Sequence, residues 1–350
     1  MDIIHIEERE KWNQIVKSFQ YWDIYYLNEY AKSFQLHGDG VPILMYYQRD
    51  EVRLCYVMMQ EDISGFSPLS KCLEIGQYYD WTTPYGYGGP LIDGEITREW
   101  MEGFIEELGY WCQSHNIVSQ FFRFHPLLQN QKLFENVFDV VYMKNTVYID
   151  TATEELIFKN MTPNNRNMVR KAIKNGIEIV TDKGDRVEDF RRIYEATMQN
   201  NQAEGYYYFQ PEYFSCLNQE MKDNIIYFYA IYQGIPISAS LFFYNNQYMH
   251  YHLSGTLPKY RKLAAANLLL SEAANWAADH SIKKFHLGGG VEIEDSLLTF
   301  KKHFNRNGLL DFCIGRSIFD KEAFDRLVEL RKANDIDFDD SKPFLIKYRA

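Results

Sequence analysis

The sequence predicts a mixed α/β (α+β) protein built from two related units. One reason is an internal repeat: WCQSHNI at 111–117 returns as WAADHSI at 276–282, with Trp, His and Ile at the same three places. Such an echo at about half the chain length indicates two similar units. The other reason is that both halves give helices, an antiparallel meander, a crossover helix and a final strand. We expect domains at 1–150 and 151–315, with 316–350 able to complete the first.

In the first unit, apolar residues at helical spacing alternate with short runs typical of strands. The clearest helix is 97–115, where apolar side chains recur every three or four residues. A glycine-rich loop at 85–90 interrupts the order. The predicted helices are 8–19, 22–34 and 97–115, and the predicted strands are 42–48, 51–59, 117–124 and 146–150.

In the second unit, Thr162-Pro163 is a good helix start and Asn175-Gly176 a good stop. Gln233-Gly234 lies between two apolar runs and predicts a hairpin. The predicted helices are 163–174, 187–200 and 267–280. The predicted strands are 177–181, 225–232, 235–243, 247–254 and 284–287. For the tail we expect a helix at 319–332 and a strand at 344–349.

Composition and charge exclude several classes of function. A chain of 350 residues with 46% hydrophobic residues can form two folded domains. The net charge of −11 argues against broad nucleic-acid binding, although a local basic contact stays open. The five cysteines form no Cys-x-x-Cys pair, so no metal site is expected. No apolar run reaches about twenty residues, and the amino terminus lacks a signal-peptide core. We therefore expect a cytoplasmic protein without a transmembrane segment.

Residues 260–267, YRKLAAAN, place basic and small residues at the start of a predicted helix. Backbone N–H groups and the helix dipole favour an anion there. Arg261 and Lys262 add positive charge, and the small side chains of Ala264 and Ala266 let a phosphate approach the backbone. An alanine-rich helix start packed on the sheet explains the same pattern, so both interpretations stay open.

The order strand, Arg-x-x-Ala-x-Ala, helix, strand resembles the acyl-carrier loop of the GNAT acetyltransferase superfamily. That loop has the pattern Gln/Arg-x-x-Gly-x-Gly/Ala and holds the pyrophosphate of coenzyme A. Here Ala264 and Ala266 replace the glycines, and each adds a methyl group where a phosphate would approach.

Four segments together resemble the Fem-type peptidoglycan-bridge aminoacyltransferases: NNRNMVRKAIKNGIEI, SGTLPKYRKLAAANLLLSEAANWA, FHLGGG and DSLLTFKKHF. The resemblance implies two tandem GNAT-like domains, each with a mixed, largely antiparallel sheet flanked by helices. It also implies aminoacyl-tRNA as the donor in place of acyl-coenzyme A. The resemblance is strongest over residues 164–304.

The predicted helix 163–174 carries Arg166, Arg170 and Lys174 at a spacing of four, which places them on one face. A solvated helix face explains this pattern. A contact to the phosphates of tRNA or of a nucleotide-linked substrate explains it as well.

Lys301 follows the FHLGGG strand on a short predicted helix that Asp295-Ser296 would cap. In the resembled family, a lysine at the matching position is held to stabilise the developing oxyanion, and a fixed cation would do so in acyl transfer to an amine. A surface lysine is the plain alternative, and the adjacent Lys302 is the other candidate.

In the first unit, Arg123 and His125 end the strand at 117–124. Arg123 is a candidate to bind an anionic substrate, and His125 a candidate to take the proton of an attacking amine. Asp80 is a second candidate base. A single histidine or aspartate is more often structural.

Tyr85 and Tyr87 lie in the glycine-rich loop, where their rings could stack on a sugar or a base. Lys32 lies near the place where the resembled family has a phosphate-binding lysine. The family's second phosphate-binding arginine has no counterpart in 200–208, NNQAEGYYY. That gap weakens the expectation of a nucleotide-linked muropeptide acceptor.

The leading hypothesis is therefore transfer of an acyl or aminoacyl group to an amine in peptidoglycan, cell-wall or surface-glycan biosynthesis. The acceptor would be a small-molecule or nucleotide-linked amine. Aminoacyl-tRNA or acyl-coenzyme A would be the co-substrate, tRNA a candidate partner, and no further cofactor is expected. The alternatives are a coenzyme A-dependent N-acyltransferase acting on an amino sugar, and an inactive GNAT-fold binding module.

Overall fold

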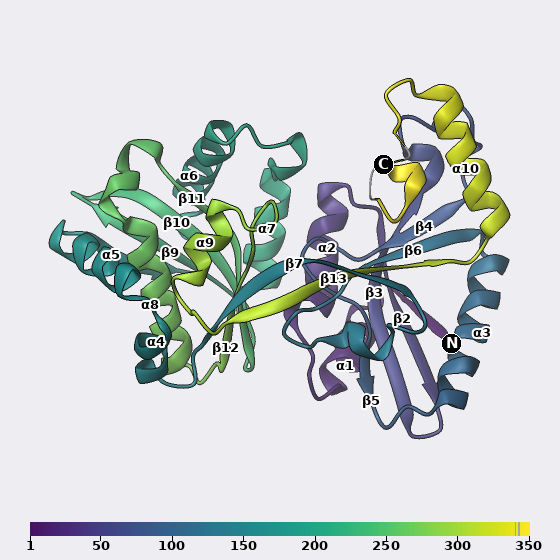
Figure 1. The fold of residues 1–350 in the computed structure, drawn as a ribbon, viewed down its shortest axis with the longest axis horizontal. Coiled ribbons are helices and arrows are strands. Elements are labelled where there is room, and N and C mark those ends of the chain that lie inside the picture. Colours follow the sequence, from purple (N-terminus) through teal and green to yellow (C-terminus); the bar gives the residue numbers. More distant parts are fainter. Residues whose placement is uncertain (340, 342–343) are drawn as a thin grey trace. The chain divides into compact units, whose positions relative to one another are not determined.

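The computed structural model describes residues 1–339, 341 and 344–350, and it has a mixed α/β fold (Figure 1). The chain divides into two compact units. Unit 1 comprises Met1–Met143 and Phe312–Ala350, and unit 2 comprises Lys144–Asp311. Each has a mixed, largely antiparallel sheet flanked by helices, which confirms the predicted fold class. No helix among the described residues is long and apolar enough to cross a bilayer.

The sheet of unit 1 has the order β1-β2-β3-β4-β6-β13, and the short β5 pairs with β3. Its strands are β1 (Asp2–His5), β2 (Val41–Arg49), β3 (Val52–Asp62), β4 (Tyr79–Thr82), β5 (Leu91–Asp93), β6 (Ile117–Arg123) and β13 (Leu309–Ile318). Its helices are α1 (Arg9–Ser18), α2 (Asn28–His37), α3 (Arg98–Ser114) and α10 (Lys321–Asn334), with short 3-10 turns at η1 (Ile24–Tyr26), η2 (Ile63–Gly65), η3 (Asn130–Leu133) and η6 (Lys347–Arg349).

The sheet of unit 2 has the order β7-β12-β11-β10-β9-β8. Its strands are β7 (Asp139–Asp150), β8 (Glu178–Asp182), β9 (Ile225–Tyr232), β10 (Ile235–Tyr244), β11 (Tyr248–Thr256) and β12 (Lys284–Gly289). Its helices are α4 (Glu154–Asn160), α5 (Pro163–Lys174), α6 (Val187–Asn200), α7 (Pro211–Glu220), α8 (Ala265–Asp279) and α9 (Ser296–Lys302), with 3-10 turns at η4 (Gly205–Tyr207) and η5 (Pro258–Leu263).

The sequence repeat is also a structural repeat. In each unit the repeat covers the end of the crossover helix and leads into a strand that pairs in parallel, β6 with β4 or β12 with β11. His115 stacks on Trp111 with 3.9 Å between ring centroids, and His280 stacks on Trp276 at the same 3.9 Å. In both copies the histidine Nδ1 lies 2.8 Å from the tryptophan carbonyl oxygen. The next residue is left-handed in both, with φ of 58° and 61°.

The two units exchange their final strands. After β6, the chain continues into β7, which pairs antiparallel with β12 of unit 2. After β12 and α9, the chain continues into β13, which pairs antiparallel with β6 of unit 1. The sheet of unit 2 is therefore completed by β7, which follows β6 of unit 1 in the sequence. The sheet of unit 1 is completed by β13, which follows β12 of unit 2 in the sequence.

Both faces of the unit 2 sheet are covered by helices, as the side chains that alternate between the two faces of β9 show. Ile226 and Phe228 belong to the core shared with α5 and α8. Tyr227 and Tyr229 alternate with them and so face the other side, where Phe190 of α6 contacts Tyr227 at 5.3 Å between ring centroids.

Two local expectations are wrong. The helix predicted at 22–34 is broken, because Leu27 is extended at φ −72° and ψ 146° and separates η1 from α2. The strand predicted at 344–349 is absent among the described residues of that segment, and 347–349 form η6 instead. Side-chain contacts of this tail, and not a strand partner, hold it on unit 1.

Candidate functional site

In unit 2, the parallel strands β11 and β12 pair for only part of their length. Their register covers Tyr248–His250 against Lys284–His286, whereas β11 continues to Thr256 and β12 to Gly289. β11 has an extra residue at this point, since Leu241 and Phe242 of β10 pair with Leu253 and Tyr251 and leave His252 as a bulge. Bulges end regular pairing and redirect side chains. The two strands therefore separate beyond His250 and leave backbone groups available to a ligand.

The side chain of the bulged His252 is held in place by helix α7. Its Nε2 lies 2.6 Å from the hydroxyl of Tyr213 on α7. Burial, together with a smaller contribution from nearby His250, lowers the pKa of His252 to about 3. The imidazole is neutral at pH 7, and with so low a pKa it takes up protons poorly.

In unit 1, the equivalent strands β4 and β6 stay paired. Their register covers all of Tyr79–Thr82, and the amide of Thr83 continues it by donating to the carbonyl of Phe121 at 3.1 Å. Gly88 then donates to the carbonyl of Arg123 at 2.7 Å. Among the described residues, only unit 2 opens its parallel pair.

Lys301 lies at this opening. Its side chain is 6% exposed, and its Nζ donates to the carbonyl of Gly289 at 2.6 Å. The same Nζ is 5.6 Å from the centroid of the Tyr251 ring on β11. Burial lowers the pKa of Lys301 to about 7, which the charge of Asp295 opposes. The neighbouring Lys302 is exposed, so the geometry selects Lys301 of the two.

The short helix α9 positions Lys301, and Asp295 positions α9. The Asp295 side chain accepts the amide of Leu298 at 2.7 Å, which is the predicted N-cap. It also accepts the amides of Val291 at 2.6 Å and Glu292 at 3.2 Å. One carboxylate thus joins the end of β12 to the start of α9.

The predicted anion loop is the η5 turn and the first turn of α8. Ala264 is left-handed at φ 61° and ψ 31° and is 7% exposed. This conformation suits glycine and costs alanine roughly 1–2 kcal/mol, and it occurs at a position where the resembled loop has glycine. No side chain caps α8, which leaves first-turn N–H groups for an anion. Arg261 and Lys262 are exposed beside it, and Ala266 is half-buried.

The basic stripe lies on α5, which packs against α8 and is joined to it by Asn267 donating to Asn165 at 2.6 Å. Arg166 turns back toward Phe158 of α4, with its guanidinium 4.7 Å from that ring. Arg170 and Lys174 are exposed. No salt bridge to these three cations occurs within the described part of the chain.

In unit 1, the two predicted acid–base residues are both buried. His125 is fully buried, with its Nε2 3.2 Å from Oδ2 of Asp23. Asp80 accepts from Arg349 at 2.7 and 3.0 Å, and from the hydroxyl of Tyr348 at 2.9 Å. The tail of the chain thus binds Asp80.

The predicted substrate-binding residues of unit 1 are partly brought together. Arg123 donates to the carbonyl of Gly86 at 3.0 Å, and its guanidinium lies 6.0 Å from the ring of Tyr85. Burial raises the pKa of Tyr87 well above its usual value. Lys32 is half-buried on α2.

Sequence reasoning missed Tyr251 and Arg349. Tyr251 has no sequence signal beyond its strand alternation, and its place beside Lys301 depends on the opening of the sheet. Arg349 reaches Asp80 across 269 residues, so no local pattern could reveal the pair.

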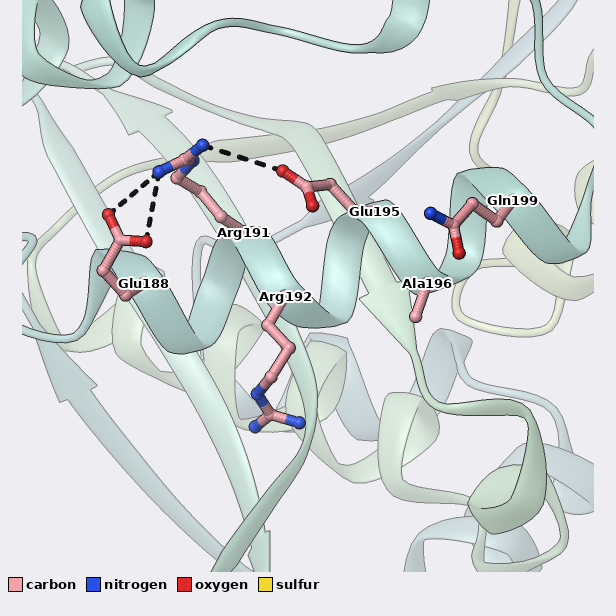
Figure 2. Close-up of a pocket in the computed structure, with 6 residues that line it drawn as sticks. All are labelled: Glu188, Arg191, Arg192, Glu195, Ala196 and Gln199. Atoms are coloured by element: carbon pink, nitrogen blue, oxygen red, sulfur yellow. Dashed lines mark hydrogen bonds and ion pairs between the residues drawn. The ribbon is translucent and has the colours of Figure 1, made fainter.

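A hollow of about 320 Å³ on α6 is a separate feature (Figure 2). Its lining residues all come from α6, and none is a candidate site residue. Arg191 there binds Glu188 at 3.0 Å and lies 3.7 Å from Glu195, so its charge is neutralised within the helix. We do not assign a function to it.

A parallel strand pair that opens at a bulge beside an uncapped helix start defines the class of the fold, which is that of GNAT acyltransferases. Residues 163–302 match the family model described as an acetyltransferase (GNAT) domain. No curated protein matches the chain.

Among solved structures, FemX is similar to the chain, with a TM-score of 0.67, 12% identity and coverage of 93% of this chain and 99% of that chain. A protein of unknown function from Bacteroides thetaiotaomicron has a TM-score of 0.58 and 10% identity, and covers 90% and 98%. The C-terminal DUF2156 domain of a protein described as a lysylphosphatidylglycerol synthetase, from Agrobacterium fabrum, has a TM-score of 0.55 and 9% identity, and covers 94% of each chain. The chain has the Fem-like tandem GNAT fold, which confirms the resemblance at the level of the fold.

Proposed function

We propose that the chain is an acyltransferase that moves an aminoacyl group from aminoacyl-tRNA to an amine in cell-envelope biosynthesis. The observation that carries this proposal is the buried cation of Lys301 at the opened ends of β11 and β12. The fold similarity to FemX and to a lysylphosphatidylglycerol synthetase domain supports an aminoacyl donor.

In the proposed reaction, the acceptor nitrogen attacks the ester carbonyl of the donor and forms a C–N bond. The carbonyl oxygen becomes an oxyanion, and the C–O bond to the tRNA ribose then breaks. The nitrogen loses a proton, and the ribose oxygen gains one. Lys301 stabilises the oxyanion through its charge, which acts more strongly from a largely buried side chain than it would in water. With a pKa of about 7, about half of the Lys301 side chains carry that charge near neutrality.

The donor binds along unit 2 in this proposal. The first turn of α8, with Arg261 and Lys262, holds a phosphate near the transferred group. Arg170 and Lys174 extend the basic surface along α5, which packs on α8. A chain of phosphates fits such a surface better than a single charged group does.

The acceptor binds to unit 1 in this proposal, through Arg123, Tyr85, Tyr87 and Lys32. His125 is the proposed proton acceptor on this unit, and it can act only when its buried ring, whose Nε2 lies against Asp23 and whose Nδ1 accepts the amide of Leu128, becomes exposed. Asp80 can take that role only when its ion pair with the tail opens.

The test is turnover by the purified chain, given aminoacyl-tRNA or acyl-coenzyme A with candidate amines, with products identified by mass spectrometry. Lys301→Ala should lower the rate roughly a hundredfold or more, as for loss of one oxyanion donor. Lys302→Ala, next to it and exposed, should leave the rate unchanged. An undiminished rate in Lys301→Ala excludes Lys301 from the mechanism, and no turnover with either donor supports the inactive binding module.

A coenzyme A-dependent N-acyltransferase acting on an amino sugar is the second candidate, favoured by the family match over 163–302. The double variant Arg170→Glu with Lys174→Glu separates the two. With a tRNA donor, it should raise KM and reduce the dependence of binding on salt. With acyl-coenzyme A, which carries far fewer phosphates than a tRNA, KM should rise less and depend less on salt.

A further inference from the structure

The turn that follows β12 is held by two lysines from two different elements. Lys301 of α9 donates to the carbonyl of Gly289 at 2.6 Å. Lys144 of β7 donates to the carbonyls of Gly290 at 2.6 Å and Val291 at 2.8 Å. Three successive carbonyl oxygens therefore bind two ammonium groups.

The amide side of the same turn is held by Asp295, which accepts the amides of Val291 and Glu292. A Cβ atom on Gly290 would lie 2.1 Å from Oδ1 of Asp295, so the turn packs closely against the carboxylate. The turn is thus fixed on both sides, and with it the carbonyl that holds Lys301.

The groups that surround the Lys301 ammonium come from α9, β7 and β11. Asp295, at the start of its own helix, favours the protonated form, and Lys144 on β7 disfavours it. Tyr251 on β11 presents its ring to the ammonium. On its own helix, Lys302 is exposed. β12 has two titratable residues: Lys284, whose Nζ lies 6.0 Å from the centroid of the Tyr148 ring, and His286, which packs against His250 at 5.8 Å between ring centroids.

We propose that Lys144 is a positioning residue for the transfer reaction. It fixes the turn that carries the Lys301 ammonium, and it keeps a second positive charge beside that ammonium. Lys144 does not contact the reacting atoms in this proposal. The inference rests on the proposed function, because it concerns how the site prepares Lys301 for its role.

The consequence is that Lys144 sets the pH at which Lys301 titrates. A neighbouring like charge makes protonation harder, so removing the Lys144 charge makes it easier and raises the pKa of Lys301. A residue that only stabilised the fold would not move this titration.

The test is an NMR titration of the ε-carbon of Lys301 in full-length protein labelled with 13C-lysine and without substrate, with the signal assigned by its loss in Lys301→Met. The wild-type signal should titrate near pH 7. In Lys144→Met the midpoint should rise by roughly half a pH unit or more. Lys144→Arg keeps the charge and Lys302→Met removes an exposed charge, so both should titrate like the wild type. A Lys144→Met midpoint equal to that of the wild type overturns the proposal.

If Lys144→Met gives no folded protein, Lys144→Gln is judged by the same titration and the same criterion. Turnover supplies a second readout, since the pH limb of kcat that Lys301 sets should move upward with the NMR midpoint while KM stays within about twofold. The two proposals can fail separately. Full activity in Lys301→Met refutes the proposed role of Lys301, whereas the NMR midpoints of the Lys144 variants decide the role of Lys144 in either case.

Discussion

Lys301→Met should make unit 2 more stable at pH 7 while it removes activity. A pKa of about 7 in the folded chain, against 10.5 for a free lysine, means that folding disfavours the charged form. The difference of about 3.5 pH units corresponds to roughly 5 kcal/mol, which sets the upper limit of the gain. Methionine fills a similar volume without the charge, but it leaves the Gly289 carbonyl without its donor, at a cost of about 1–3 kcal/mol. The expected net gain in the free energy of unfolding is about 2–4 kcal/mol.

The pH dependence gives the sign of the effect. Between pH 7 and 10.5 the unfolded wild-type chain binds more protons at residue 301 than the folded chain does. The wild-type free energy of unfolding therefore rises with pH in this window. Lys301→Met lacks this rise, so its advantage is fully present below about pH 7 and shrinks by roughly 3 kcal/mol at pH 9.5.

The measurement is urea unfolding at pH 7 and pH 9.5, with amide hydrogen exchange of peptides from β12 and α9 reporting on unit 2. Lys302→Met is the control, because the exposed neighbour should show no difference that depends on pH. If Lys301→Met is less stable than the wild type at pH 7, or if its advantage is the same at both pH values, the buried charge does not have the cost described.

Three further predictions concern the packing. Arg349→Ala leaves the buried Asp80 carboxylate without its cation and should lower the free energy of unfolding of unit 1 by about 3 kcal/mol, measured by urea unfolding. Gly255→Ala places a Cβ 2.7 Å from a backbone oxygen of α6 and should lower the melting temperature of unit 2 by several degrees. Gly205→Ala is the matched control, because its Cβ meets nothing within 4 Å, and it should leave the melting temperature unchanged. Asp295→Ala removes the cap of α9 and should lower the free energy of unfolding by about 1 kcal/mol. It should also lower the pKa of Lys301 further, which the 13C titration detects. An unchanged titration midpoint would contradict the attraction between Asp295 and the Lys301 ammonium.

Sequence reasoning was sufficient for what local patterns determine. The Trp–His repeat indicated two units because the same helix end and the same left-handed residue recur in each. The cap of α9 followed from Asp295-Ser296, since an N-cap needs only its own helix. Arg166, Arg170 and Lys174 share a helix, and their spacing alone placed them together.

The remaining features depend on contacts between distant segments. Lys301 is buried where two strands separate at a bulge. No periodicity in the sequence predicts which residue of a strand will bulge. The tail forms a 3-10 turn and not a strand, and its Arg349 binds a carboxylate far away in the sequence, a contact that no local pattern predicts. Leu27 broke a helix that its neighbours favoured, which shows that apolar spacing alone does not fix helix ends.

The exchange of final strands has a consequence for the order in which a ribosome can finish the two units. Unit 2 is one continuous stretch, Lys144–Asp311, and holds all of its own strand partners once that stretch has emerged. Unit 1 waits for β13 and then for Arg349, which is synthesised later still. The middle stretch of the chain is therefore complete first, and a chain cut before residue 312 is left with one finished unit and one open sheet.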